Sequence, residues 1–227
     1  MPAIASSDIR AAFVRCSETV ERHQAYLTRL DAVLGDGDHG DNLALGFRAV
    51  CESIDVADPD TAPGPLIRSA GYTLAASAGG ASGPLYGTAL IQAGLAAGGA
   101  RTLDAATLDR MLEAAASALA ARGRCGVGDK TIYDALRPAV DAFHDAFRSG
   151  QPAEACLAAA VDAAWHGMRR TRGLIARRGL GLRLGVRSVG HLDPGAVSCV
   201  LLLRAMVPTR RSGDAVRAPT VAGASAS

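Results

Sequence analysis

The sequence predicts an all-α fold in which amphipathic helices run antiparallel. Apolar residues recur at spacings of three, four and seven, which is the period of a helix with one buried face. Strict alternation over five or more residues occurs nowhere, and β-branched residues are sparse. With 227 residues, 49% of them hydrophobic, the chain suffices for one domain with a full core. We expect that domain over residues 1–207.

The first four helices are expected as two pairs, one before and one after a loop. Residues 8–30 and 42–54 each carry apolar side chains at every third or fourth position. Residues 58–65 are rich in proline, aspartate and glycine, which is the composition of a loop. Helices over 66–78 and 83–98 are expected to follow it.

The next two helices are bounded by recognisable start and stop signals. The range 104–121 follows two glycines and ends at Gly123. Thr131 and Asp134 have the spacing of a capping box, which predicts a helix start at Thr131. That helix is expected to reach residue 147, with Pro138 as the site of a kink.

The last two helices are separated by a glycine-rich connection. Pro152 opens a helix expected to extend to Ala176, and the connection covers 179–195. The final helix has its apolar run over 197–206. From residue 208 to 227 the composition is that of a disordered tail.

Four polar, glycine-rich segments fall between the expected helices, at 35–42, 79–84, 123–131 and 190–195. An even number of helices separates each segment from the next. In an up-and-down bundle such segments emerge at the same end, so we expect a functional site there.

Composition excludes several classes of function. The net charge is +2 with both signs interspersed, which does not favour a nucleic-acid or membrane partner. The five cysteines include no CxxC pair, so neither a disulfide framework nor a zinc site is expected. No signal peptide is apparent and no apolar run reaches the roughly 18 residues of a membrane span. A cytoplasmic protein is expected.

An acidic cluster at Asp31, Asp36 and Asp38 predicts a metal site. Two charges about 4 Å apart repel by roughly 4 kcal/mol at an effective dielectric near 20, so their convergence calls for a cation. Three carboxylates suit Mg²⁺. The spacing does not match a calcium-binding EF-hand, because position five counted from Asp36 is Gly40 and position twelve is Phe47. A solvated acidic turn is the alternative.

The other clusters are ambiguous when each is taken alone. Residues 79–84 favour either phosphate binding at a helix start or close helix packing. Residues 123–131, which hold the only lysine, Lys130, fit either a ligand loop or a capping turn with one surface lysine. Asp193 before Pro194 fits a helix N-cap.

Taken together, these clusters resemble a known family, the nucleotide-binding subunit L of dihydroxyacetone kinase. The resemblance covers residues 8–206 and is specific in the order of its motifs. The matching runs are Leu30-Asp31 with Gly35 to Gly40 and Asn42, Gly79 to Thr88, Gly128 to Thr131, and Arg187 to His191 with Asp193 to Gly195.

The resemblance implies a barrel of eight antiparallel helices with a nucleotide held in loops at one end. It implies that Asp31, Asp36 and Asp38 hold two Mg²⁺ ions, and that the nucleotide is ADP or ATP. Catalysis would be Mg²⁺-assisted transfer, with His39 the one candidate for a direct catalytic role. The implied nucleotide contacts are His39, Gly40, Asp41, Asn42, Ala81, Ser82, Gly123, Ile132, Asp193, Pro194 and Gly195.

One stretch departs from the family pattern, which reads Lys-Gly-Arg-Ala-Ser-Tyr-Leu-Gly-Glu-Arg-Ser before the Gly-His pair. Here residues 178–188 read Arg-Gly-Leu-Gly-Leu-Arg-Leu-Gly-Val-Arg-Ser, and Leu180 replaces the arginine that reaches the nucleotide. Arg178 and Arg183 are the nearby candidates to substitute for it, although a shifted guanidinium is not equivalent.

Two functions fit this pattern. In the first, the chain passes a phosphoryl group from bound nucleotide to a short-chain ketose held on a separate K-type partner subunit. The resemblance leaves open whether ADP stays bound and is recharged by a phosphotransferase-system protein, or ATP exchanges each turnover. In the second, the chain is a non-catalytic ADP–Mg²⁺-binding regulatory module that acts through partner contact.

Overall fold

The computed structural model describes residues 3–207, and all its regular elements in that range are helices, apart from an isolated bridge between Ile4 and Leu103. The prediction of an all-α fold with eight α-helices is confirmed for these residues. The predicted tail over 208–227 lies outside them. The α-helices are α1 (Ser6–Leu34), α2 (His39–Asp55), α3 (Pro63–Ser77), α4 (Ser82–Ala97), α5 (Ala105–Gly123), α6 (Tyr133–Arg148), α7 (Ala153–Arg170) and α8 (Pro194–Met206).

The main difference from the sequence prediction lies after α7, which ends at Arg170 rather than near Ala176. Two 3₁₀ segments follow, η1 (Thr171–Gly173) and η2 (Leu180–Ser188). Just after the end of α7, the Thr171 carbonyl accepts a hydrogen bond from Lys130 Nζ, which ties the chain to the loop before α6. A smaller difference is at Pro63, for which the sequence predicts a loop and which begins α3 in the structure.

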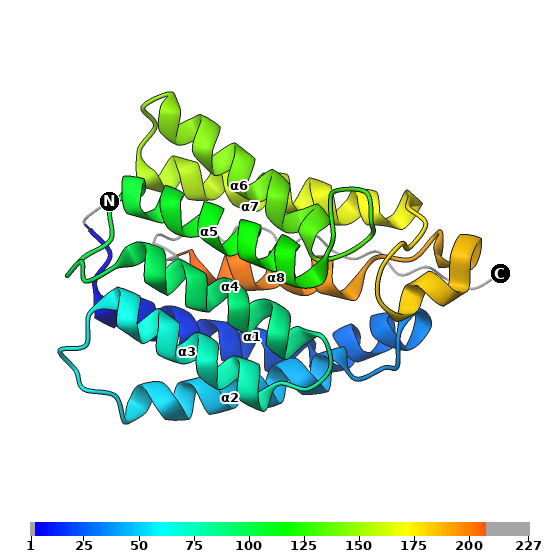
Figure 1. Cartoon of the computed structure of the whole chain (residues 1–227), viewed down its shortest axis with the longest axis horizontal. Coiled ribbons are helices and arrows are strands. Elements are labelled where there is room, and N and C mark those ends of the chain that lie inside the picture. Colours follow the sequence, from blue (N-terminus) through cyan, green and yellow to red (C-terminus); the bar gives the residue numbers. More distant parts are fainter. Residues whose placement is uncertain (1–2, 208–227) are drawn as a thin grey trace, which may run out of the picture.

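The helices pack in a cyclic order. Each contacts the next along the chain, and α8 packs against α1. Figure 1 shows the helices lying lengthwise and alternating in direction. The Arg15 side chain of α1 donates to the Ala205 carbonyl of α8 at 2.8 Å. This is the order of neighbours expected of a closed helical bundle.

The core is built from small and aliphatic side chains with few aromatics. Phe47 and Phe143 are the largest fully buried side chains, surrounded by leucine, valine and alanine. A second feature of the interior is an apolar cavity of about 220 Å³, bounded by side chains that include Phe13, Tyr86 and Ile132. Within residues 3–207, no helix is long and apolar enough to cross a membrane.

The alternation of helix direction gathers the four glycine-rich segments at one end of the bundle. Figure 1 shows the α1–α2, α3–α4, α5–α6 and α7–α8 connections together at its right-hand side. The N-terminus of α1 lies at the opposite end. The predicted convergence of these loops is therefore confirmed.

Candidate functional site

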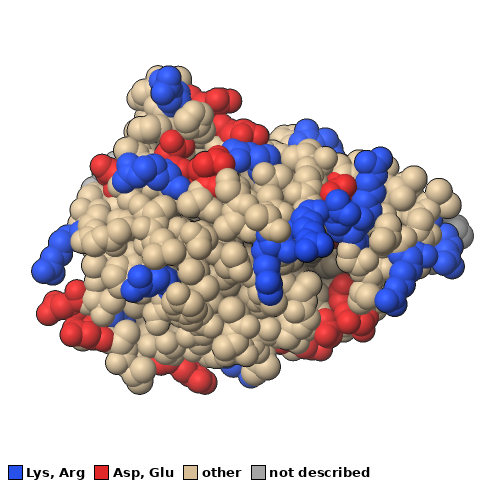
Figure 2. Space-filling view, viewed as in Figure 1, with Lys and Arg blue, Asp and Glu red and all other residues tan. Residues whose placement is uncertain are grey.

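The converging loops enclose a cavity of about 620 Å³. Four helices begin at its wall, because α2, α4, α6 and α8 all start at this end. The unpaired backbone N–H groups of helix starts carry partial positive charge and favour anions. Figure 2 shows acidic and basic side chains near one another at this end of the molecule. The cavity therefore combines anion-binding backbone with charged side chains of both signs.

Asp31 organises the first loop of the site. It lies in the last turn of α1, and its Oδ2 accepts the backbone N–H groups of Gly37 at 3.0 Å, Asp38 at 3.1 Å and His39 at 3.3 Å. Gly37 has φ 77°, a left-handed conformation that glycine adopts without strain. A Cβ at Gly35 would collide with the Asp31 carboxylate. The two glycines thus allow the chain to fold around one carboxylate.

This fold brings the three predicted carboxylates together. Asp31, Asp36 and Asp38 each offer an oxygen, and these oxygens lie within 4.8 Å of one another. Burial raises the pKa of the Asp38 carboxyl; the Asn42 amide counteracts the rise, and the charges of Asp36 and Asp31 add to it. The Asn42 amide nitrogen is buried without a hydrogen bond of standard geometry. Three all-oxygen ligands at this spacing fit a Mg²⁺ site.

His39 begins α2 and points between two other helices. Its Nδ1 lies 2.9 Å from Ser82 Oγ of α4, and its Nε2 lies 2.9 Å from Ser198 Oγ of α8. Burial lowers the pKa of His39, although the Asp31 charge and the Pro194 backbone act in the opposite direction. The ring is therefore anchored at both nitrogens.

Asp193 caps α8, as the sequence predicts, and its carboxylate accepts the Ala196 N–H at 2.7 Å. Burial raises the pKa of Asp193 to about 7; the Ala196 hydrogen bond and the Lys130 charge act in the opposite direction. The cap of α8 thus titrates near neutral pH.

Most of the predicted nucleotide contacts line the cavity, and three of them do not. Gly40 is buried against α1, where a Cβ would meet the Gln24 carbonyl. Asp41 is exposed and accepts a hydrogen bond from the Gln24 amide at 2.7 Å. Asn42 packs beside Gly79 in the α3–α4 loop. The predicted residues that line the cavity are Asp31, Asp36, Asp38, His39, Ala81, Ser82, Gly123, Ile132, Asp193, Pro194 and Gly195.

Lys130 is not the surface residue of the capping-turn alternative, since only 2% of it is exposed. Its Nζ donates to the carbonyl oxygens of Thr171 and His191, each at 2.6 Å. Its backbone adopts the left-handed region with φ 62°. Burial lowers the pKa of Lys130, and the charges of Asp193 and Asp134 partly offset this. Lys130 therefore joins the α5–α6 loop to the two ends of the α7–α8 connection.

The departure at Leu180 lies at the cavity itself. Leu180 lines the cavity and is 39% exposed. Arg178 also lines it, but its guanidinium pairs with Asp129 at 3.3 Å. Arg183 is exposed and is not among the lining residues. Neither arginine occupies the place of Leu180.

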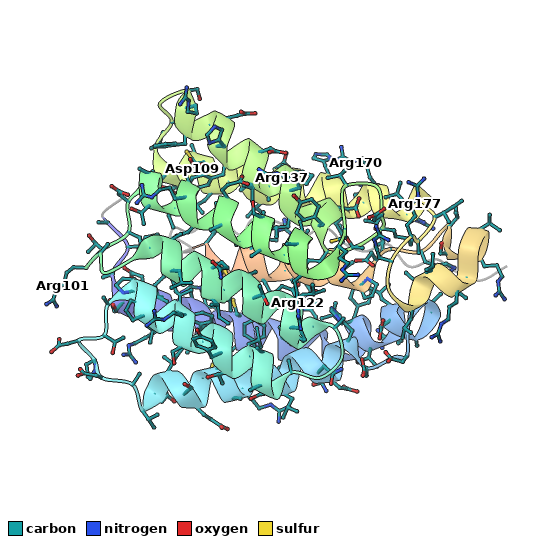
Figure 3. All side chains as sticks on the ribbon, viewed as in Figure 1. Arg101, Asp109, Arg122, Arg137, Arg170 and Arg177 are labelled. Carbon is teal, nitrogen blue, oxygen red and sulfur yellow. The ribbon has the colours of Figure 1, made fainter. Side chains whose placement is uncertain are left out.

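Two lining residues that sequence reasoning missed are Tyr86 and Arg122. Arg122 comes from the last turn of α5 and is labelled in Figure 3. Tyr86 lies one turn into α4 and approaches Ser198 Oγ at 2.7 Å. Tyr86 lies two positions after the glycine-rich run at 79–84, and this proximity is the available signal.

Comparison with known proteins gives consistent matches over most of the chain. The family model described as the DAK2 domain matches residues 33–208. The ADP-binding subunit DhaL of PEP-dependent dihydroxyacetone kinase 2 from Listeria innocua is 39% identical over 191 residues, covering 83% of this chain and 87% of that protein. The corresponding Escherichia coli subunit is 36% identical over 191 residues, covering 84% of this chain and 90% of that protein.

A solved structure shows the same fold. The dihydroxyacetone kinase from C. freundii in complex with AMP-PNP and Mg²⁺ superposes with a TM-score of 0.65 at 25% identity. The match covers 91% of this chain and 34% of that chain, so this chain spans about a third of that kinase.

Proposed function

Because the chain belongs to the DAK2-domain family, we propose that it is the nucleotide- and Mg²⁺-binding subunit of a split dihydroxyacetone kinase. In this role it passes a phosphoryl group from bound nucleotide to dihydroxyacetone, or a related short-chain ketose, held on a K-type partner subunit. A kinase subunit of this kind works in the cytoplasm, in keeping with its five free cysteines.

The observation that carries the proposal is the position of the three carboxylates beside four helix starts at one cavity. Asp31, Asp36 and Asp38 would hold two Mg²⁺ ions, which neutralise charge on the phosphates when bound. The His39 and Ala196 N–H groups are already bonded to Asp31 and Asp193, and the other backbone N–H groups in the first turns of α2, α4 and α8 would orient the phosphates. Phosphoryl transfer depends mainly on positioning and charge stabilisation, which these groups supply.

We further propose that ADP is retained as a cofactor and recharged by a phosphotransferase-system protein. The two similar subunits are both named as ADP-binding parts of PEP-dependent kinases, which supports this mode over free exchange of ATP. Gel filtration of the loaded subunit tests it. Retention of ADP through the column is expected, and loss of ADP with turnover on added ATP would favour exchange.

Reconstitution tests the main proposal. The subunit is combined with a K-type partner, dihydroxyacetone, Mg²⁺ and either ATP or a phosphoenolpyruvate-driven donor. We expect ketose phosphate only when both subunits are present. Absence of phosphate transfer from every donor, with subunits that are folded and bind nucleotide, would refute it.

Leu180 favours a second candidate function, a non-catalytic ADP–Mg²⁺-binding regulatory module that acts through partner contact. The cavity lacks a guanidinium at that position, and η2 exposes the apolar side chains of Leu182 and Val186. Such a module would bind nucleotide with Mg²⁺ and never transfer a phosphate, so the same reconstitution separates the two functions.

A further inference from the structure

A chain of polar side chains connects the carboxylate loop with the wall of the interior cavity. It runs from Ser82 Oγ to His39 Nδ1 at 2.9 Å, from His39 Nε2 to Ser198 Oγ at 2.9 Å, and from Ser198 Oγ to the Tyr86 hydroxyl at 2.7 Å. These residues come from α2, α4 and α8, which are far apart in the sequence. Tyr86 lines both the interior cavity and the polar cavity, so it lies at the boundary between them.

The direction of these hydrogen bonds depends on where the Ser198 proton points. Its hydroxyl donates to the Gly195 carbonyl at 3.0 Å, within the first turn of α8. When the Ser198 proton points to this carbonyl, the hydroxyl accepts from both His39 and Tyr86, because a serine hydroxyl has one proton. The Tyr86 hydroxyl is 3.5 Å from the same carbonyl, which is too long for a good bond, so Tyr86 donates to Ser198.

In that arrangement His39 carries its proton on Nε2. In the neutral ring, Nδ1 is left as an acceptor, and it takes the hydroxyl proton of Ser82. The oxygen of Ser82, at the start of α4, is thereby left with lone pairs available to the cavity. We propose that Ser198 and Tyr86 are positioning residues that fix the tautomer of His39 and, through it, the orientation of the Ser82 hydroxyl at the nucleotide site.

The surroundings of Ser198 make it difficult for a water molecule to take over its hydrogen bonds. Ser198 is fully buried, and beyond Tyr86 the interior cavity is apolar. A water molecule needs two to four polar partners, which the apolar side does not offer. Removal of the Ser198 hydroxyl would therefore take away the side-chain acceptor of the His39 Nε2–H and leave the ring with the Pro194 backbone, an arrangement that favours the other tautomer or a rotated ring.

The same ring is tied to the carboxylate loop through its backbone. The His39 N–H donates to Asp31 Oδ2 at 3.3 Å, and Asp38 precedes it in the chain. A change in the pose of His39 therefore reaches both the Ser82 hydroxyl and the loop that carries the carboxylates. The role assigned to Ser198 and Tyr86 rests on the proposed function only in that the cavity binds a Mg²⁺–nucleotide.

The test compares Ser198→Ala and Tyr86→Phe with Tyr72→Phe, a matched control at an exposed tyrosine on α3. The ¹⁵N chemical shifts of the His39 ring distinguish protonated from unprotonated nitrogen. We expect the Nε2–H form in the parent and control, and a mixture of tautomers in Ser198→Ala. ADP–Mg²⁺ affinity should fall by about tenfold in Ser198→Ala and by less in Tyr86→Phe, as is typical when the partner that orients a site residue is lost.

The outcomes separate this inference from the proposed function. An Nδ1–H ring in the parent, or an unchanged tautomer and affinity in both folded variants, would overturn the inference. If Ser198→Ala does not fold, Tyr86→Phe keeps the ring and provides the same two readouts. The tautomer readout requires no phosphate transfer, so a parent with the predicted ring but no kinase activity contradicts only the proposed function.

Discussion

His39 Nε2 lies 2.9 Å from Ser198 Oγ, and 159 positions of sequence separate the two residues. One partner begins the second helix and the other lies inside the eighth. Their contact requires that α1 and α2 be closed against α8. The His39 ring therefore reaches its position at the cavity only when α8 is packed against α1 and α2.

Asp36→Asn and Asp38→Asn are each expected to abolish Mg²⁺-dependent nucleotide binding. The substitution removes a negative charge from three clustered carboxylates and leaves the backbone hydrogen bonds to Asp31 in place. In the parent protein, ADP and Mg²⁺ at about 100 times the dissociation constant should add roughly 2.7 kcal/mol of stability, visible as a raised melting temperature.

The matched control for these variants is Asp41→Asn, whose carboxylate contacts Gln24 outside the cavity. It should keep the full melting shift. All three variants should retain the helical circular-dichroism signal. Survival of the shift in both Asp36→Asn and Asp38→Asn would show that the metal assignment is wrong.

Leu180→Arg is expected to tighten binding of Mg²⁺–nucleotide by about tenfold, which corresponds to about 1.4 kcal/mol. The new guanidinium would lie at the cavity edge, where charge-assisted hydrogen bonds to phosphate are strong. Leu182→Arg adds the same charge to η2 at a residue that does not line the cavity and serves as control. Calorimetric titration measures both. Equal or weaker binding by Leu180→Arg would indicate that another basic group already occupies that role.

Lys130→Met is expected to lower the free energy of unfolding by about 3 kcal/mol, because two carbonyl groups lose a charged donor in a buried place. Urea unfolding measures the loss. Arg172→Gln is the control: the exposed Arg172 side chain donates to the Gly190 carbonyl at 2.9 Å, and its loss should cost below about 1 kcal/mol. Similar losses in the two variants would contradict a special role for Lys130.

Asp193 should make the stability of the protein depend on pH. Its pKa is raised to about 7 in the folded state, whereas an unfolded aspartate titrates near about 3.9. The folded state therefore retains a proton that the unfolded state has lost, and the resulting stabilisation declines as pH rises from about 4 to about 7.

The comparison for Asp193 is Asp193→Asn, because asparagine keeps the N-cap hydrogen bond and does not titrate. Melting temperatures of both proteins are measured across that pH range. The parent should lose stability relative to the variant with rising pH. Parallel curves would show that the carboxyl is ionised throughout.

Helix periodicity and loop chemistry made most of the fold predictable. The apolar spacing gave all eight helices, and the parity of the connections placed four loops at one end. The carboxylate cluster was also predictable, since Asp31, Asp36 and Asp38 lie within one short segment. These features are set by residues that lie close together in the sequence, so they can be predicted from it.

Features that depend on packing between distant helices were not predictable. Ser198 and Tyr86 lie at helical spacing among apolar residues and look like parts of the core. The outward direction of Asp41 is set by Gln24 on α1, and the burial of Lys130 by carbonyls of the α7–α8 connection. Periodicity identifies the buried face of a helix but not which neighbouring helix it meets.

The grouping of the site loops at one end leaves the other end free for handling the protein. Residues 149–152, which connect α6 and α7 there, are all exposed. Gly150 in this turn has φ 78°, and none of these residues lines the polar cavity. A tag or fluorophore inserted in this turn would tether the molecule by its far end and present the cavity to solution. Such an attachment suits the capture of a partner that must approach the nucleotide.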